Sequence, residues 1–441
     1  MDYRAAIEFL YSFSDFERSG RFSSRRDLSP MLALLEALDN PHLGRMTVHV
    51  AGSKGKGSVA AMLESMLRAA GIVTGLNTSP HLCRITERVL VAGVEVSSAE
   101  FAEATARVAQ AVEKVAPRLA SERRLVTFDL ITALAFCIFK AHAVSVQIIE
   151  VGLGGLLDST NVFERKECAV ITRLGLEHRD ILGNRLREIA LNKAGILRPG
   201  CTAVMAPQLS EAAEVIRSEA RRVGAPLVEV EPAAQSSLLS SSTQGQRCLL
   251  ARQSGSLECE LPLLGRHQIE NATVAVAGLD ALERAGVQVP DAAVQSGLKA
   301  LTWPARIEVV SRAPWVVVDS AHTEDSALQL CSTLKEYLGI ERATFVVGVM
   351  RDKELGLMAQ AISRAARGVI ATAVDHPRAL EASAAAYTFR QAGVEALAEA
   401  SLARALELAL SAEGSAGAVV VMGSVALAGE ARALLRALVS A

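Results

Sequence analysis

Seven short apolar runs, rich in valine and isoleucine, constrain the fold of this 441-residue chain more than any other feature. Each run is followed by glycine or a polar turn, and then by a stretch with helical periodicity. Runs that are apolar throughout are typical of strands in a parallel sheet that is covered on both faces. We therefore expect an α/β fold built on parallel sheets. The runs are MTVHVAG, VSVQIIEVGLGG, CAVITRLG, WVVVDSAH, ATFVVGVM, GVIATAV and GAVVVMG.

The runs fall into two groups, which we interpret as two domains. A helix-like stretch, NATVAVAGLDALERAG, closes the first group, and a new βαβ series begins after Pro304. We predict an N-terminal domain over residues 1–300 and a smaller C-terminal α/β domain over residues 301–441. Within the first, AAQSSLLSSSTQGQR is rich in serine and glutamine, and predicts a loop or a weak hairpin.

The bulk composition limits the classes of partner and compartment. The 46 basic and 48 acidic residues give a net charge of −2, which does not favour nucleic acid or an anionic membrane as a partner. The seven cysteines lack CxxC spacing, which indicates neither a disulfide framework nor a zinc site. The first residues are too charged for a signal peptide, and the apolar stretch ITALAFCIF is too short to span a bilayer. We expect a cytoplasmic monomer.

The segment VHVAGSKGKGS joins an apolar run to a helical pattern and has the composition of a phosphate-binding loop. It departs from the generic Walker spacing, because two residues instead of four separate Gly52 from Gly55. The physical requirements are still met. Glycines let backbone N–H groups converge on phosphate, Lys56 can reach the terminal phosphates, and Ser58 can bind Mg²⁺. A glycine turn with solvated lysines is the alternative, but the order strand, loop, helix favours the phosphate loop.

Polar side chains also follow other apolar runs, where ligands of open α/β sheets bind. Ser79 follows GIVTGLNT, Glu150 ends VSVQIIE, and His178 follows CAVITRLG. A carboxylate at a buried strand end is costly without a cation, so we favour Mg²⁺ ligation by Glu150 over a structural salt bridge. In the second group the corresponding residues form a polar rim that would face the phosphate loop. They are Asp319, His322, Asp352, Lys353, Asp375, His376, Arg378 and Ser424.

One lysine lies on an apolar helical face in LREIALNKAGILRPG. Leu186, Ile189, Ala190 and Leu197 form the stripe, and Lys193 falls on it. A buried lysine must find an anion, lose its proton or be modified. Snorkelling to solvent is the alternative, and the spacing alone does not decide between them.

Eight motifs, in a fixed order, carry a resemblance to a known family: HVAGSKGKGS, TSPHLCRITERV, IEVGLGGLLDSTN, LGLEHRDILG, NKAGILRPG, GRHQIENA, WPARIEVV and DSAH. With them the chain closely resembles the folylpolyglutamate synthase/dihydrofolate synthase family of the Mur ligase superfamily, over almost its whole length. The resemblance implies a P-loop central domain with a parallel sheet and a smaller, Rossmann-like C-terminal domain. It also implies ATP-dependent amide formation between a folate-type carboxylate and L-glutamate through an acyl phosphate. The folate-type substrate would be dihydropteroate, a tetrahydrofolate polyglutamate, or both.

The resemblance further implies roles for residues of this sequence. The ATP site would comprise Gly55, Lys56, Gly57, Ser58, Asn271, Arg306 and Asp319. Two Mg²⁺ ions would be held by Ser58, Ser79, Glu150 and His178. The pterin would lie against Val126, Thr127, Phe128, Asp129, Leu157, Asp158 and Ser159. The incoming glutamate would lie near His322 and Ser424. Lys193 matches a carbamylated lysine, and with Lys56 and His178 it would act in catalysis.

Some residues depart from the family pattern, and other functions stay open. Leu156 stands where many relatives carry arginine, Thr323 replaces the usual asparagine, and Glu177 replaces aspartate. The alternatives are another Mur-superfamily amino acid ligase, a generic P-loop NTPase or kinase, and a catalytically silent folate- or nucleotide-binding paralogue. About fifty residues precede the phosphate loop, too few for the UDP-binding domain of cell-wall ligases. The combination of Lys56, Glu150, His178 and Lys193 argues against a silent paralogue.

Overall fold

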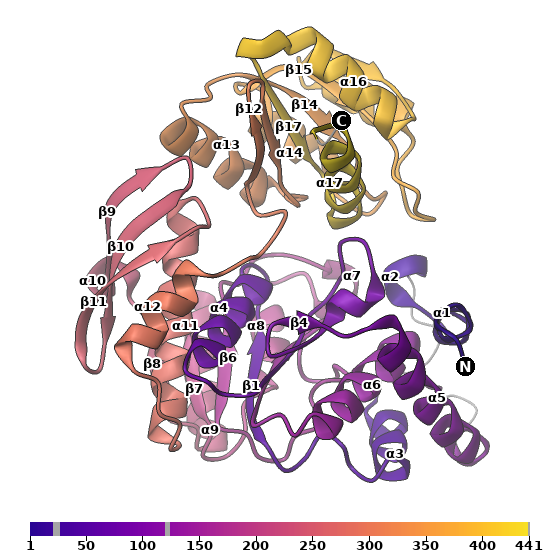
Figure 1. The fold of residues 1–441 in the computed structure, drawn as a ribbon, viewed down its shortest axis with the longest axis vertical. Coiled ribbons are helices and arrows are strands. Elements are labelled where there is room, and N and C mark those ends of the chain that lie inside the picture. Colours follow the sequence, from indigo (N-terminus) through magenta and orange to yellow (C-terminus); the bar gives the residue numbers. More distant parts are fainter. Residues whose placement is uncertain (21–26, 120–123, 440–441) are drawn as a thin grey trace.

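The computed structural model describes residues 1–20, 27–119 and 124–439. It has two bodies, one above the other in Figure 1. The large body runs from α1 to α12 and contains an eight-stranded and a three-stranded sheet; the small body runs from β12 to α17 and contains a six-stranded sheet. The chain passes from one body to the other between Lys299, the last residue of α12, and Glu308, the first residue of β12.

The eight-stranded sheet has the order β4-β3-β2-β5-β1-β6-β7-β8. Six neighbouring strands, β2, β5, β1, β6, β7 and β8, are parallel, and β3 and β4 add an antiparallel edge beside β2. The strands are β1 (Met46–Ala51), β2 (Thr74–Asn77), β3 (Val89–Val91), β4 (Val94–Glu95), β5 (Val146–Glu150), β6 (Cys168–Ile171), β7 (Thr202–Met205) and β8 (Leu227–Glu229).

Helices cover both faces of this sheet. One face packs on α4 (Lys56–Ala69), α11 (Arg266–Arg284) and α12 (Asp291–Lys299). The other face packs on α1 (Tyr3–Tyr11), α3 (Ser29–Ala37), α5 (Ser98–Val115) and α6 (Thr127–Ala141), and further along on α8 (Leu186–Ala194) and α9 (Ser210–Val223). Three short helices complete the large body: α2 (Phe16–Ser19), α7 (Arg179–Leu182) and α10 (Pro232–Gln235).

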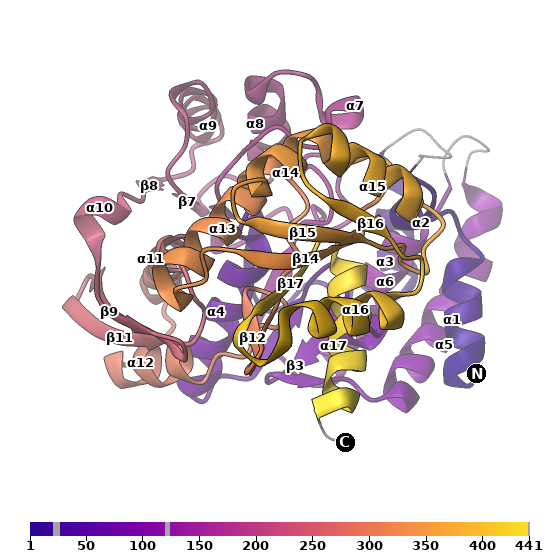
Figure 2. The same ribbon diagram turned by 90° about the horizontal axis from the view of Figure 1, so that it is seen from above.

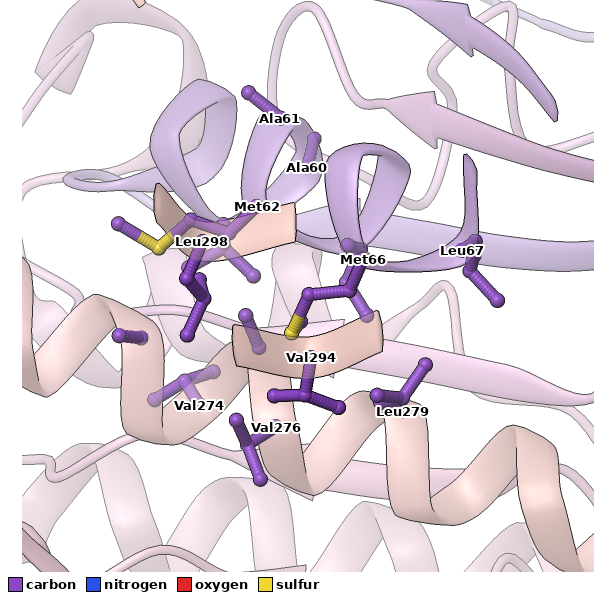
Figure 3. Packing of buried hydrophobic residues seen from close by; sticks show 14 of the residues in the cluster. Ala60, Ala61, Met62, Met66, Leu67, Val274, Val276, Leu279, Val294 and Leu298 are labelled. Carbon is purple, nitrogen blue, oxygen red and sulfur yellow. The ribbon is translucent and has the colours of Figure 1, made fainter. Parts of the chain in front are cut away.

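The helix α4 is deeply buried. The predicted helix is confirmed, and every residue from 58 to 67 is buried, including polar ones. Figure 3 shows the reason: Met62 and Met66 of α4 lie against Leu298 and Val294 of α12, which covers the side of α4 that would otherwise face solvent. The phosphate loop is therefore followed by a helix that is fixed on all sides.

The serine-rich segment forms a three-stranded antiparallel sheet, in the order β11-β10-β9. Its strands are β9 (Ser236–Ser242), β10 (Gly245–Arg252) and β11 (Gly255–Leu261). The predicted hairpin is thus confirmed and the predicted loop is wrong. Cys248 and Leu250 of β10 are buried, and they anchor the sheet to the core of the large body.

The six-stranded sheet of the small body has the order β12-β13-β17-β14-β15-β16, with only β12 antiparallel. The strands are β12 (Glu308–Arg312), β13 (Trp315–Val318), β14 (Ala343–Val347), β15 (Ala366–Ala371), β16 (Ala396–Ala398) and β17 (Ala418–Met422). One face packs on α13 (Glu324–Leu338), α14 (Leu355–Ile362) and α15 (Ala382–Gln391), and the other on α16 (Leu402–Glu413) and α17 (Val425–Val439), as Figure 2 shows.

All seven apolar runs are strands, which confirms the predicted α/β class. Within the described ranges, none of the helices combines the length and the apolar character that crossing a membrane requires.

Candidate active site

A cleft of about 970 Å³ lies between the two bodies. Most of the residues expected to bind ATP, Mg²⁺, pterin or glutamate line it, although they come from distant parts of the chain. The lining includes Gly55, Lys56, Gly57, Ser58, Ser79, Val126, Phe128, Asp129, Glu150, Leu157, Asp158, Ser159, His178, Asn271, Arg306, Asp319, His322 and Ser424. Thr127 and Lys193 lie outside this lining. The hydroxyl of Thr127 instead donates to the carbonyl of Leu10 at 3.0 Å, which attaches α6 to α1.

The phosphate loop connects β1 to α4. The backbone N–H groups of Ser53 and Lys54 donate to the carbonyl oxygen of Arg173, both at 3.0 Å, which fixes the first half of the loop. The first helical bond runs from Val59 N to Gly55 O at 2.9 Å, so the N–H groups of residues 56–58 precede it and have no helical acceptor. These N–H groups, at the positive end of a buried helix, suit a phosphate group.

At two positions of the loop, neighbouring side chains leave no space for a Cβ, so glycine is required there. Gly55 has a φ of +83°, and a Cβ there would lie 2.3 Å from Oδ1 of Asn271. A Cβ on Gly57 would lie 2.9 Å from Cζ2 of Trp303. The loop therefore lies directly against α11 and against the connection between the bodies. Lys56 reaches back within the loop and donates to Gly52 O at 3.0 Å.

Glu150 is a buried carboxylate at the end of β5. It accepts a hydrogen bond of 3.2 Å from the N–H of Ser79, which follows β2. Burial raises the pKa of Glu150, and the charge of Lys56 opposes that shift only in part. Among the residues that the structure describes, no cationic side chain lies within ion-pairing distance of it. A buried carboxylate of this kind is favourable only beside a cation.

The residues present fit Mg²⁺ better than a transition metal. In the described ranges, no three or more His, Cys, Asp or Glu side chains are grouped so that they could hold a metal ion. The oxygen atoms that could bind a metal ion at this edge are those of the Glu150 carboxylate and of the Ser58 and Ser79 hydroxyls. Mg²⁺ prefers oxygen ligands, and it is usually held by one or two carboxylates together with water and substrate phosphates.

Lys193 lies behind the phosphate loop and is 1% exposed. Its Nζ donates to Gly52 O at 2.7 Å and to Oε1 of Glu177 at 2.8 Å. Burial lowers the pKa of Lys193, and Glu177 opposes the shift. Burial would raise the pKa of Glu177, but Lys193 and Lys56 outweigh burial and hold this pKa well below its usual range. The sequence left open whether Lys193 finds an anion, loses its proton, is modified or reaches solvent. The structure shows an anion, Glu177, beside it, and carbamylation stays a prediction.

His178 begins α7 with a positive φ of 45°, and the ring of Phe16 packs edge-on against it, with centroids 6.3 Å apart. Burial is the main cause that lowers the pKa of His178 to about 4. The imidazole is therefore neutral near pH 7, which is the form that binds metal ions.

The residues expected to contact the nucleotide come together from both sides of the connection. Asp319, at the end of β13, accepts hydrogen bonds from Ile307 N at 2.8 Å and from Ala321 N at 2.7 Å. Arg306 donates to the hydroxyl of Ser320 and to Ala305 O. Burial raises the pKa of Asp319, and Arg306 counteracts the shift. These bonds hold the connection against the small body.

The expected pterin wall contains an unusual carboxyl. Asp129 accepts hydrogen bonds from Ser159 Oγ at 2.6 Å and from Val126 N at 2.9 Å, and burial nevertheless raises its pKa to about 6. The ring of Phe128 lies against Gly152, where a Cβ would meet its Cζ at 2.5 Å. This wall therefore presents an aromatic ring beside a carboxyl that titrates near neutrality.

On the expected glutamate side, His322 has a defined tautomer. Its Nδ1 lies 2.8 Å from the carbonyl oxygen of Ser320, which requires a proton on Nδ1 and leaves Nε2 as an acceptor. Ser424 lies at the start of α17, where its hydroxyl accepts from Leu427 N at 3.1 Å. Lys54 of the phosphate loop donates to Oγ1 of Thr323 at 2.8 Å and so crosses the cleft.

The sequence reasoning missed one cluster of the lining. Arg88 is buried, pairs with Glu17 of α2 and donates to Nδ1 of His81 at 2.9 Å. Arg378 of the small body donates to the backbone carbonyl of Glu17 at 3.0 Å. Arg88 lies in the motif RITERV, but no local pattern points to Glu17, so only the tertiary structure reveals the pair.

Comparison with known proteins agrees with this geometry. The family description "Mur ligase middle domain" matches residues 50–279, and "Mur ligase, glutamate ligase domain" matches residues 305–425. Folylpolyglutamate synthase of Lacticaseibacillus casei is 31% identical over 442 residues, 99% of each chain. Dihydrofolate synthase/folylpolyglutamate synthase of Bacillus subtilis is 34% identical over 81% of this chain and 84% of its own.

Solved structures of relatives share the whole fold. Mycobacterium tuberculosis folylpolyglutamate synthase, complexed with ADP and AMPPCP, superposes with a TM-score of 0.89 at 30% identity, over 98% of this chain and 99% of its own. An AMPPCP–folate complex of a folylpolyglutamate synthase has a TM-score of 0.84 at 29% identity over 98% and 99%. The chain therefore belongs to the Mur ligase superfamily, and within it to the folylpolyglutamate synthase/dihydrofolate synthase family.

Proposed function

We infer that the protein is an ATP-dependent ligase that joins the carboxylate of a folate-type substrate to the amine of L-glutamate. One observation carries this inference: a single cleft is lined by the phosphate loop, by the Phe128 and Asp129 wall, and by His322 of the small body. The relatives named above are folylpolyglutamate and dihydrofolate synthases, and their solved structures contain ADP, AMPPCP and folate. The substrates are therefore small molecules.

The reaction takes place in two steps. A carboxylate oxygen of the pterin substrate attacks the γ-phosphorus of ATP, ADP leaves, and an acyl phosphate forms. The glutamate amine then attacks the acyl carbon, phosphate leaves with that carboxylate oxygen, and the nitrogen releases one proton to solvent. Lys56 and the N–H groups that begin α4 hold the phosphates and offset the charge that moves during transfer. Mg²⁺, when bound by Ser58, Ser79 and Glu150, would neutralise phosphate charge.

His322 has a suitable form for the second step. Its neutral ring keeps a proton on Nδ1, so Nε2 can accept a hydrogen bond from the glutamate amine and orient its lone pair. His178, also neutral, would bind a second Mg²⁺.

Carbamylation of Lys193 belongs to the same proposal. A carbamate would bring a negative charge beside Glu177, so it needs a cation between the two groups or a proton on Glu177. In protein exchanged into ¹³C-bicarbonate, we expect a carbamate carbon signal that is missing from Lys193→Met. Identical spectra of the two proteins would exclude the modification.

We further propose a cytoplasmic monomer with two domains, residues 1–300 and 301–441, that has no nucleic acid or membrane partner. The two bodies have separate sheets, and apart from Leu264, which packs in the cluster of the small body, the residues of the two apolar clusters are separate, which supports this division. All seven cysteines are free thiols, which suits a reducing compartment.

Phosphate release tests the function directly. The purified protein should release phosphate only when ATP, L-glutamate and a pterin substrate are all present. Dihydropteroate and tetrahydrofolate, supplied in turn, distinguish the dihydrofolate synthase from the folylpolyglutamate synthase activity. Nucleotide binding without glutamate-dependent release from either pterin would instead indicate the silent paralogue.

A further inference from the structure

Lys54 connects the phosphate loop to the small body. Its Nζ donates a hydrogen bond of 2.8 Å to Oγ1 of Thr323, which lies 269 residues further along the chain. The backbone N–H of Lys54 is anchored to Arg173 O, and the side chain of Thr323 accepts a hydrogen bond from Ser326 N as the cap of α13. Both ends of the contact are therefore fixed by backbone groups, which gives the ammonium a defined place in the cleft.

The lysines around the loop differ in their partners. Lys193 pairs with Glu177 at 2.8 Å and Lys353 pairs with Asp352 at 3.2 Å, so each has a carboxylate of the protein itself. Among the described residues, no carboxylate lies within ion-pairing distance of Lys54, whose acceptor is a neutral hydroxyl. Burial lowers the pKa of Lys54, and the charges of Glu177 and Asp325, which lie beyond ion-pairing distance, oppose this shift only in part. Such a cation is best satisfied by an anion that enters the cleft.

The position of Lys54 indicates which anion this is. Lys56, the other unpaired lysine of the loop, lies against Gly52 O at 3.0 Å, and its backbone carries the first of the N–H groups assigned to the phosphates. Lys54 lies on the side of His322: burial and then the charge of Lys54 are the main causes that lower the pKa of His322 to about 3. Three anionic substrates meet in the cleft: ATP, the carboxylate of the folate-type substrate, and glutamate. Lys56 lies beside the N–H groups assigned to the phosphates, and the expected pterin wall belongs to the large body. Lys54 instead contacts Thr323 of the small body, next to His322, on the expected glutamate side.

We propose that the Lys54 ammonium binds one of the two carboxylates of the incoming glutamate, and that Thr323 holds the ammonium in position for it. This rests on the proposed ligase function, which makes glutamate a substrate. An ammonium has three N–H donors, so Lys54 can donate to Thr323 and to a carboxylate at the same time. Because Lys54 and Thr323 belong to different bodies, this pocket is complete only when the bodies are together.

Four variants test the assignment. Lys54→Met removes the ammonium at similar length, Lys54→Arg keeps a positive charge, and Thr323→Val removes the hydroxyl at the same shape. Lys299→Met is the matched control, because this lysine is exposed and pairs with Glu260 at 2.9 Å on the large body. The measurements are KM for glutamate at saturating ATP and pterin, and Kd for AMPPCP.

We expect Lys54→Met to raise the KM for glutamate by at least about tenfold, with the Kd for AMPPCP changed by less than about twofold. Thr323→Val should cause a smaller rise, Lys54→Arg should recover part of the loss, and Lys299→Met should change neither quantity. Glutamine and isoglutamine each lack one carboxylate. With one of these two acceptors the penalty of Lys54→Met on kcat/KM should disappear, because the missing carboxylate is the one that Lys54 binds.

Two results would overturn the proposal. Weaker AMPPCP binding with an unchanged KM for glutamate would assign Lys54 to the phosphates instead. An equal penalty with glutamate, glutamine and isoglutamine would show that Lys54 binds neither carboxylate. If Lys54→Met does not fold, as judged by its Tm, Lys54→Arg and Thr323→Val carry the same comparisons. Failure of the wild-type protein to release phosphate with glutamate would contradict the ligase function itself, and this is seen before any variant is made.

Discussion

At the scale of single residues, Lys56 has the most direct role in the proposed chemistry. Its ammonium lies against the phosphate loop, where Gly52 O is its hydrogen-bond acceptor among the described residues. We expect Lys56→Ala to lower kcat/KM by at least about a hundredfold, because a positioned cation opposite the moving phosphoryl charge is lost. The Tm should stay close to that of the wild type.

Steady-state phosphate release and thermal unfolding of the same preparation check this expectation. Lys299→Ala, which removes an exposed lysine outside the cleft lining, serves as the control. A folded Lys56→Ala protein with wild-type kcat/KM would remove the phosphate-loop interpretation.

Asp129 gives a dependence of stability on pH. Burial raises its pKa to about 6 in the folded protein, from 3.8 for an aspartate that is exposed to water. Between these values the folded protein binds more protons at this carboxyl than the unfolded chain does, so its contribution to stability decreases as pH rises from about 4 to 6. The total decrease is at most about 3 kcal/mol. The Tm of the wild type minus that of Asp129→Asn should therefore fall across this window and level off above it. A difference that is constant from pH 4 to 7 would contradict the raised pKa.

Single residues also show what the sequence can and cannot predict. Glu150 and His178 follow strands, and strand ends are recognisable locally, so their place in the cleft was predictable. The partner of Lys193 was not, because Glu177 comes from a separate loop and only tertiary packing brings the two within 2.8 Å. The same holds for Arg88 and Glu17, which lie 71 positions apart.

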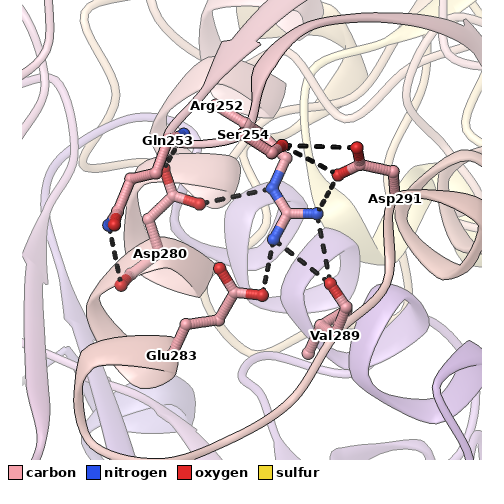
Figure 4. A network of polar contacts seen from close by, with 7 residues as sticks. All are labelled: Arg252, Gln253, Ser254, Asp280, Glu283, Val289 and Asp291. Atoms are coloured by element: carbon pink, nitrogen blue, oxygen red, sulfur yellow. Dashed lines mark hydrogen bonds and ion pairs between the residues drawn. The ribbon is translucent and has the colours of Figure 1, made fainter.

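At the scale of elements, one arginine adds a polar link between the small antiparallel sheet and the helices of the large body, beside the apolar contacts of Cys248 and Leu250. Arg252, at the end of β10, has a side chain that is 3% exposed and pairs with Asp280, Glu283 and Asp291 (Figure 4). Its guanidinium also donates to Val289 O at 3.2 Å. One side chain thus connects the sheet to α11, to α12 and to the turn between them.

We expect Arg252→Leu to destabilise this attachment by roughly 3 kcal/mol, because three carboxylates lose their shared cation. Hydrogen exchange of the β9–β11 amides measures the effect, as faster exchange in the variant. Arg247→Leu on the same strand is the control: its pair with Glu258 is exposed on both sides, so at most about 1 kcal/mol should be lost. If the β9–β11 amides exchange equally fast in Arg252→Leu and Arg247→Leu, the ion pairs of Arg252 do not hold the sheet in place.

The same sheet shows why the sequence left a loop and a hairpin open as alternatives for this segment. All but one of the residues of β9 are exposed, and the strand consists of serines and two exposed leucines, Leu238 and Leu239. A strand without a buried face has no alternation of apolar and polar residues to detect. Its pairing depends on β10, where Cys248 and Leu250 reach the core. The seven apolar runs, in contrast, were recognisable as parallel strands, whereas β7, a short parallel strand that is also buried, was not among them.

At the scale of the whole molecule, the cleft depends on contacts that cross between the bodies. Lys54 meets Thr323, and Arg378 of the small body meets Glu17 of α2. The phosphate loop and the pterin wall belong to the large body, and His322 and Ser424 belong to the small one. Neither body holds a complete site, so the two-step reaction requires both bodies together.

Transfer of an oxygen atom tests the central claim, amide formation through an acyl phosphate, most directly. The pterin substrate is prepared with ¹⁸O in its carboxylate and incubated with ATP, Mg²⁺ and L-glutamate. Mass spectrometry then measures the isotope in the released phosphate and the mass of the pterin product. We predict a pterin product extended by one glutamate, and one ¹⁸O atom in each phosphate released. Phosphate that contains only ¹⁶O, or labelled phosphate without an extended pterin, would contradict it.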